Sequence, residues 1–474
     1  MRTIAIALCA AVALLATAAP APAAGVVVPP YTRTVLPNGA TLLVMPREDV
    51  PLIAFTAIVR GGSVAETGEQ AGVASLTAGL LEKGAGSRNA FEFADTVEGA
   101  GGSFSAAAAS EAIVVSGQFL AQDRELMVEL LADALLRPHF AAAEFDSLRN
   151  RRIESIRAAK DSDPSGLIRS YGRAFLFAKH PYGRAASGSE RSLASITRDD
   201  VLAYYRANFG GDRLTLIVAG DVDTVALTKS VEAAFAGWAR AAVPLPALAS
   251  PVRTTGRRVL LVDQPGAAQT YFWLANTGVA RNFAARAPLE VVNTLYGGRF
   301  TSILNTELRI KSGLSYGASS GFVRGSVPGE FAISSFTQTD TTAAAIDLAL
   351  ATLAGLHEQG LTDDMLASSR TYVLGQFPLQ LETASHWVAA LAELELYGLD
   401  RSYIEGYGGA VEGVDRQAAQ RVIEEAFPRP ENLAIVMIGD AAKIRAVAAR
   451  YGPVTEMPLS APDFAAPPAP RPVR

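Results

Sequence analysis

The chain has little cysteine, little histidine and no concentrated charge. Its 474 residues include one cysteine, Cys9, and four histidines, and no block of five or six like charges occurs. A single cysteine excludes a disulfide framework and a cysteine-rich metal site. The net charge of -5 is mild for this length. It argues against a nucleic-acid-binding protein, because such proteins carry a concentrated basic surface.

The N-terminus has the pattern of a targeting segment. Met1 and Arg2 give a short basic start, an apolar run follows over 4–18, and small residues come next. This pattern predicts a signal peptide over 1–24. The alternative is a membrane anchor, but the run is short for a bilayer and prolines follow it at once. Export and the lack of cysteine in the mature chain favour a periplasmic protein without a stable membrane anchor.

An internal repeat divides the chain. Gly220-Asp221 and Gly439-Asp440 lie 219 residues apart, and each pair follows a turn and an apolar run and precedes a helix-like stretch. The repeat predicts two homologous halves. Prolines between them disfavour helix and sheet interiors. We therefore expect an N-terminal domain over 25–242, a linker over 243–255, a C-terminal domain over 256–456 and a proline-rich, extended or disordered tail over 457–474.

Apolar runs alternate with helical patterns in both halves. In the first half, strands are expected at 41–45, 52–59, 113–119 and 214–218, and helices at 72–81, 124–136 and 143–160. In the second half, strands are expected at 259–262 and 269–276, and helices at 285–295 and 341–357. Some strands are joined by loops too short for a crossover. This order favours an α+β fold with a mixed or antiparallel sheet covered by helices in each half.

The first half carries a recognisable order of motifs. A strand leads to Gly61-Gly62, an acidic turn, a helix that includes Gly72, and then Lys83-Gly84. This order resembles the pitrilysin (insulinase, inverzincin) family of zinc peptidases, and the resemblance extends over 31–454. It implies that the two halves form a clamshell.

In that family the helix carries the zinc motif His-x-x-Glu-His, in which two histidines bind the metal and the glutamate activates its water. The five matching positions here read Ser75-Leu76-Thr77-Ala78-Gly79. Ser75 and Gly79 stand in place of the histidines, and Ala78 stands in place of the base. The resemblance therefore implies a degenerate zinc site.

The third ligand position of the family falls on Ile156, counted back from Asp163-Pro164. Glu154 is two residues away and would point elsewhere on a helix; it is interpreted, with Glu82, as a solvated helix residue. The histidines form no local pair for a replacement site: His139, His180, His357 and His386. We expect no metal and no other cofactor in this chain.

A segment of the second half keeps the family's other site residues. The stretch from Gly297-Gly298 to Tyr316 resembles the pattern Gly-Gly, Ser-x-Leu, Glu-x-Arg, Gly-Leu-Ala-Tyr. The resemblance implies that Arg309 and Tyr316 hold the substrate carbonyl and stabilise the oxyanion, and that the glycine pair contacts substrate. The alternative is structural: Arg309 would pair with Glu307 or a backbone carbonyl, and Tyr316 would pack at a strand start.

Together these features resemble zinc-free subunits, such as the alpha subunit of mitochondrial processing peptidase and those of bacterial two-chain peptidases. The resemblance implies a heterodimer in which Arg309 and Tyr316 act in trans on a zinc-bearing partner, with unstructured peptides as substrates. Peptides of this family add a strand to a sheet edge, which falls on 101–110 here. Two alternatives remain: a purely structural or peptide-binding homologue, similar to the core subunits of cytochrome bc1, and an active peptidase with an unrecognised site.

Overall fold

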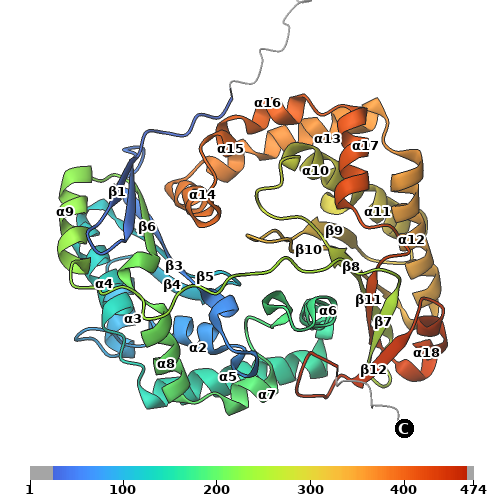
Figure 1. Ribbon diagram of the computed structural model, residues 1–474, viewed down its shortest axis with the longest axis horizontal. Coiled ribbons are helices and arrows are strands. Elements are labelled where there is room, and N and C mark those ends of the chain that lie inside the picture. The colour runs from blue at the N-terminus through green and yellow to red at the C-terminus, as the bar shows by residue number, and fades with distance from the viewer. Residues whose placement is uncertain (1–24, 467–474) are drawn as a thin grey trace, which may run out of the picture.

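The computed structural model describes residues 25–466, so the predicted signal peptide and Cys9 lie outside the described part of the chain. The described residues form two halves, each built on one six-stranded sheet with helices (Figure 1). The predicted α+β class with two homologous halves is confirmed. The predicted helices and strands agree with the structure to within two residues at each end, apart from a π-helical extension of the helix expected at 285–295.

The first sheet has the order β1-β2-β6-β3-β5-β4. Only the β2–β6 pair is parallel, and the other neighbours are antiparallel. β6 is buried along its whole length, which explains why its sequence is a continuous apolar run. The strands are β1 (Thr32–Val35), β2 (Thr41–Pro46), β3 (Leu52–Arg60), β4 (Ser103–Ala108), β5 (Ala112–Leu120) and β6 (Leu214–Gly220).

The second sheet has the corresponding order β12-β7-β11-β8-β10-β9, but two of its pairs are parallel, β7–β11 and β7–β12. β6 and β11 hold the same place in their sheets, and they end on the repeated pairs Gly220-Asp221 and Gly439-Asp440. The repeat seen in the sequence is therefore a repeat of the fold. The strands are β7 (Arg258–Asp263), β8 (Gln269–Thr277), β9 (Ala318–Phe322), β10 (Glu330–Gln338), β11 (Ala434–Gly439) and β12 (Val454–Pro458).

Helices pack on one face of each sheet. Those of the first half are α2 (Val73–Leu80), α3 (Ala90–Gly99), α4 (Arg124–Leu136), α5 (Ala142–Ser162), α7 (Glu190–Ser195), α8 (Arg198–Asn208) and α9 (Thr224–Phe235). Those of the second half are α10 (Arg286–Asn293), α11 (Ile303–Asn305), α12 (Thr342–Gln359), α13 (Asp363–Gln376), α15 (Ser402–Glu405), α16 (Tyr407–Glu412), α17 (Arg416–Ala426) and α18 (Ala441–Ala449). Within residues 25–466, no helix combines the length and the apolar character needed to cross a membrane.

In addition, one helix of each half packs on the sheet of the other half. α6 (Ile168–Phe177) packs on β8 and β11 of the second sheet, and α14 (Ala384–Tyr397) packs on β3 and β6 of the first (Figure 1). Gly172 makes the first contact possible, because a Cβ there would lie 2.6 Å from the Trp273 ring. Both apolar cores consequently contain residues of both halves. A large apolar interface of this kind fixes the halves relative to each other.

The chain leading into β1 is anchored on the second half. Val28 is buried there, its N–H donates to Glu405 at 3.1 Å, and its carbonyl accepts from Arg401 at 2.7 Å. Residues 236–257 connect α9 to β7 without a helix or strand and include the predicted linker. The N-terminal segment and the connection therefore both bridge the halves.

The C-terminal segment returns to the first half. The tail predicted from 457 onward starts later, because Met457 and Pro458 still belong to β12. Beyond the strand, the Phe464 ring is buried edge-on against Tyr171, with ring centroids 5.0 Å apart. Lys160 Nζ donates to the carbonyl of Ala461 at 2.6 Å. Residues 459–466 thus hold α5 and α6 rather than extending into solvent.

Candidate functional site

The helix that carries the degenerate motif, α2, is fixed at its start by glycine and by a buried carboxyl. Gly72 adopts a positive φ of 100°, and a Cβ there would come within 2.8 Å of Gly188. Glu66 Oε1 accepts hydrogen bonds from the N–H groups of Gly72 and Ala74 at 3.1 and 2.9 Å. These bonds satisfy amides that a helix start leaves free.

An arginine fills the space between the two positions where the family has histidines. Arg152, on the facing helix α5, donates to the Ser75 hydroxyl and, through Nη2 at 3.0 Å, to the Ser75 carbonyl. A Cβ at Gly79 would lie 3.0 Å from the same Nη2. The guanidinium therefore lies against both Ser75 and Gly79 on one face of α2.

This arrangement does not fit a divalent cation. Burial lowers the pKa of Arg152 from its usual value, and repulsion by Arg151 adds to the effect, but arginine keeps its charge in proteins. Ala78 and Ile156 are buried and apolar. Among residues 25–466, no three histidine, cysteine, aspartate or glutamate side chains gather in a way that could hold a metal. A fixed positive charge in this place disfavours zinc, and the absence of a metal remains a prediction.

The other residues considered for metal binding have local roles. Glu154 is exposed and accepts from Arg157 at 2.8 Å, and Glu82 lies beside Lys83. The four histidines lie apart: His139 bonds the Gly86 carbonyl, His180 caps a short turn at Tyr182, His357 bonds the Pro428 carbonyl, and His386 lies in the first turn of α14.

Sequence reasoning missed Arg152, although a signal was available. Arg152 lies four residues before Ile156 on a helix that was predicted at 143–160. Residues spaced by four share one face of a helix. A search of that face for charged residues would have found the arginine beside the lost ligand positions.

Glu66 gives the site an expected pH dependence. Its carboxyl is buried, and burial raises its pKa from 4.5 to about 8 despite the two amide donors and the charge of Arg184. Oε2 is buried without a partner among the described residues. The folded protein thus binds this proton more tightly than the unfolded chain does. The contribution of protonated Glu66 to the free energy of unfolding is therefore fully present below pH 4.5 and is lost as the pH rises through about 8.

We expect Glu66→Gln to remove this pH dependence, because glutamine keeps the oxygen acceptor for α2 and carries no charge. Between pH 5 and 8, the free energy of unfolding of the natural protein should fall by at least about 1.4 kcal/mol more than that of the variant, which corresponds to one unit of pKa difference. Urea unfolding at both pH values measures this difference. Parallel pH curves for the two proteins would contradict the assignment.

In the second half, the structure brings Arg309 and Tyr316 together. The Arg309 guanidinium carbon lies 4.4 Å from the centroid of the Tyr316 ring and 4.9 Å from that of Phe300. Tyr316 is 73% exposed. Glu307, the expected alternative partner of Arg309, pairs with Lys311 at 2.7 Å instead. Within residues 25–466 the Arg309 guanidinium makes no ion pair and no hydrogen bond.

The backbone around this pair is irregular. Arg309 lies on a π-helical turn, η8 (Thr306–Lys311), that continues α11, and a second π-helical turn, η7 (Thr294–Gly298), continues α10. Such turns are rare and frequently occur at functional sites. Asn305 Oδ1, at the end of α11 just before η8, accepts from the N–H of Ala318 and so ties α11 to the start of β9 near Tyr316.

The glycine pair has a packing role at one of its two positions. Gly297 is buried, and a Cβ there would lie 2.3 Å from Ser320 Oγ. Only glycine lets η7 approach β9 so closely. Gly298 is exposed. Substrate contact remains a prediction for both residues, and exposure makes Gly298 the accessible one.

The predicted substrate edge corresponds to a real sheet edge. β4 ends the first sheet, and it pairs only with β5. A cavity of about 480 Å³ lies between this part of the sheet and α14. Ser103, Ser105 and Gln118 line the cavity from the sheet side, and Ser385 donates from α14 to Gln118 at 3.2 Å.

Two family models match the chain, and both describe peptidase family M16. Residues 52–188 match the model described as insulinase (peptidase family M16), and residues 195–372 match the one described as peptidase M16 inactive domain. An uncharacterized zinc protease of Mycobacterium tuberculosis is 28% identical over 403 residues, which cover 83% of this chain and 88% of the relative.

Solved structures show the same fold. The peptidase M16 inactive domain from Pseudomonas fluorescens superposes with a TM-score of 0.80 at 22% identity, over 87% of this chain and 98% of that one. The periplasmic protease PqqL from Escherichia coli superposes with a TM-score of 0.69 at 15% identity, over 89% of this chain and 50% of that one. The family models, the sequence relatives and the fold agree: the chain belongs to the insulinase (pitrilysin) family of peptidases, family M16, and its residues 195–372 match the model of the family's inactive domain.

Proposed function

We propose that this chain is the non-catalytic subunit of an exported zinc peptidase heterodimer, and that it supplies Arg309 and Tyr316 to the zinc site of a homologous partner. The observation that carries the proposal is the Arg309–Tyr316 pair: the guanidinium carbon lies 4.4 Å from the ring centroid, Tyr316 is exposed, and half-buried Arg309 has no ion pair in the described part of the chain. A structural pair would instead be buried or bonded within its own half.

The chemistry of the pair suits the stabilisation of a new negative charge. A guanidinium and a phenol both donate hydrogen bonds. Fixed donors aimed at an oxyanion lower the barrier to peptide hydrolysis, and this electrostatic contribution is usually the largest one in acyl transfer. The Arg309 guanidinium contacts the rings of both Tyr316 and Phe300, and these cation–π contacts favour one position of the guanidinium before substrate arrives.

The first half of the chain cannot perform the metal-dependent step itself. Arg152 places a positive charge against Ser75 and Gly79, and Ala78 has no proton acceptor. In the proposed heterodimer, the attacking water and its base come from another polypeptide. This requirement supports a zinc-bearing partner of the same family, with zinc in the partner and none in this chain.

A periplasmic location is part of the proposal. The apolar start of the sequence is consistent with export, and a periplasmic protease of Escherichia coli shares the fold.

Unstructured peptides suit such a subunit as substrates, because an extended segment can add to the free edge of β4.

The free β4 edge also supports a second candidate function, which is peptide binding without proteolysis. The adjoining cavity offers hydroxyl and amide groups next to the edge. The two candidates differ in one respect: only the subunit role needs the open Arg309–Tyr316 pair.

Co-expression with a homologue that carries His-x-x-Glu-His, encoded next to this chain, tests the proposal. We expect hydrolysis of an unstructured fluorogenic peptide by the co-purified pair, and at most background hydrolysis by either chain alone, because each chain lacks part of the site. Peptide binding by this chain, with no change in the partner's activity, would favour the second candidate instead.

A further inference from the structure

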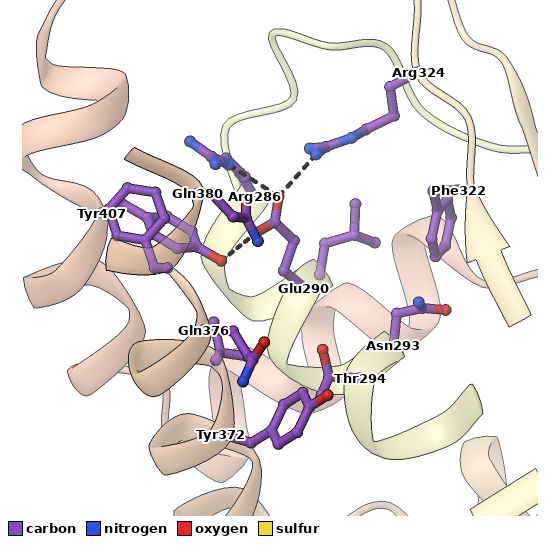
Figure 2. A pocket seen from close by; sticks show the side chains of 13 residues that line it. Arg286, Glu290, Asn293, Thr294, Phe322, Arg324, Tyr372, Gln376, Gln380 and Tyr407 are labelled. Carbon is purple, nitrogen blue, oxygen red and sulfur yellow. Dashed lines mark hydrogen bonds and ion pairs between the residues drawn. The ribbon is translucent and has the colours of Figure 1, made fainter. Parts of the chain in front are cut away.

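A cavity of about 320 Å³ lies in the second half, between α10 and α13. Phe322 at the end of β9, Arg324 in the hairpin that follows, and Tyr407 of α16 complete its wall (Figure 2). The volume is at the small end of the range for ligand pockets, ~300–1,000 Å³. Neither Arg309 nor Tyr316 lines this cavity.

Glu290 lies at the centre of a positive cluster in the cavity. One of its oxygens accepts from Arg286 Nε at 2.9 Å and from Arg324 Nη2 at 2.8 Å, and the other accepts from Tyr407 (Figure 2). Burial alone would raise the pKa of Glu290, but the two arginine charges and the Tyr407 hydroxyl hold it below its usual value. The carboxylate is therefore ionised, and two cations with one anion leave one net positive charge.

Arg324 has donor capacity that the chain does not use. Its side chain is only 8% exposed, and its Nη1 is buried without a hydrogen-bond partner among the described residues. A buried N–H of a charged group that lacks an acceptor bears the full cost of its desolvation. Glu290 does not supply the missing acceptor, because it bonds Nη2 of Arg324 and not Nη1.

The neutral wall of the cavity offers further free polar groups. Gln376, Gln380 and Tyr372 line it (Figure 2); all three are exposed, and their side-chain polar atoms make no hydrogen bond within residues 25–466. Asn293 differs, because it already exchanges hydrogen bonds with Ser320. The free amides lie on α13 and just beyond it, across the cavity from α10.

We propose that this cavity binds a small organic monocarboxylate of the size of an N-acylated amino acid or dipeptide, with its carboxylate on Arg324 and its amide groups on Gln376 and Gln380. One uncompensated positive charge matches a single negative charge, whereas a phosphate ester with two charges would leave one of them unbalanced. A guanidinium also matches a planar carboxylate in geometry. The proposal is independent of the subunit role, since it concerns this chain alone.

Isothermal titration of the full mature chain tests the proposal with N-acetyl-alanyl-alanine as the probe. We expect the free acid to bind and its C-terminal amide to bind at least about tenfold more weakly, because the amide loses a charge-assisted hydrogen bond. Inorganic phosphate should not compete at equal concentration. Equal binding of acid and amide, no binding of the acid, or competition by phosphate would each overturn the proposal.

Substitutions locate the site. Arg324→Lys keeps a positive charge beside Glu290 but removes the free Nη1, and it should weaken binding of the acid at least about tenfold. Arg445→Lys is the matched control, because the exposed Arg445 of α18 also pairs with a carboxylate, that of Glu456 on β12. This variant should bind the acid as tightly as the natural protein does. If Arg324→Lys does not fold, Gln376→Ala replaces it, and natural affinity in that variant would contradict the assignment.

Discussion

Replacement of Tyr316 by phenylalanine is expected to lower kcat of the reconstituted heterodimer about 10²–10³-fold, because one donor to the oxyanion is lost. KM should change little, because the hydroxyl contributes to the transition state more than to substrate binding. The ring itself remains, so Arg309 keeps its cation–π contact. Steady-state kinetics on a fluorogenic peptide measure both constants.

The matched control is Tyr31→Phe. Tyr31 also lies under an arginine, with the Arg401 guanidinium carbon 5.9 Å from its ring centroid, but it belongs to the segment before β1. Removal of the Tyr31 hydroxyl should leave kcat of the reconstituted heterodimer unchanged. Equal activity of the Tyr316→Phe pair and the natural pair would contradict the role proposed for the phenol.

Arg309→Lys separates charge from geometry at the same site. Lysine keeps the positive charge but loses the planar fork that can hold a carbonyl oxygen. If the fork positions the oxygen, this variant should lose much of kcat, and Arg309→Ala should lose at least as much. Full activity of Arg309→Lys would mean that only the charge matters.

The second large effect is expected from Trp273→Ala, which should lower the free energy of unfolding by about 3–5 kcal/mol. Trp273 lies on β8, is 2% exposed, and packs against Gly172 of α6 from the other half. Its removal opens a cavity between the halves that neither sheet can close alone. Urea unfolding followed by circular dichroism measures the loss.

A double substitution tests whether this contact joins the halves. Gly172→Leu alone should destabilise the protein, because a Cβ there already meets the Trp273 ring at 2.6 Å. In the Trp273→Ala background the leucine enters the space left by the indole, so its cost should be smaller. If the two losses of unfolding free energy simply add in the double variant, the two residues do not touch.

The elements of this fold follow from local sequence. β6 and β11 are continuous apolar runs that end in Gly-Asp, and their repetition predicts two homologous halves. Turn glycines, prolines and helix caps such as Asn89 and Thr197 mark the boundaries. The loss of the zinc ligands is also visible locally, because Ser75, Ala78 and Gly79 lack metal-binding side chains whatever their surroundings.

The sequence pattern did not predict the exchange of α6 and α14 between the halves. Each helix contacts a sheet whose strands lie far away in the chain, and no periodicity records which sheet a helix will cover. The same limit applies to the segment after β12. Its prolines predict an extended or disordered tail, but Leu459 and Phe464 are buried, and the pocket beside Tyr171 exists only after both halves have folded.

The sequence by itself determined which chemical groups this protein has and which it lacks: no metal-binding side chains at the positions of the family's zinc motif, and an arginine and a tyrosine seven residues apart in the second half. Only the tertiary structure decided what those groups meet. Arg152 reaches Ser75 from another helix, and Arg309 reaches Tyr316 because a π-helical turn and the loop after it fold back on each other. The first contact depends on packing between helices that are far apart in the chain, and the second on the exact course of an irregular backbone; a linear pattern of residue types encodes neither.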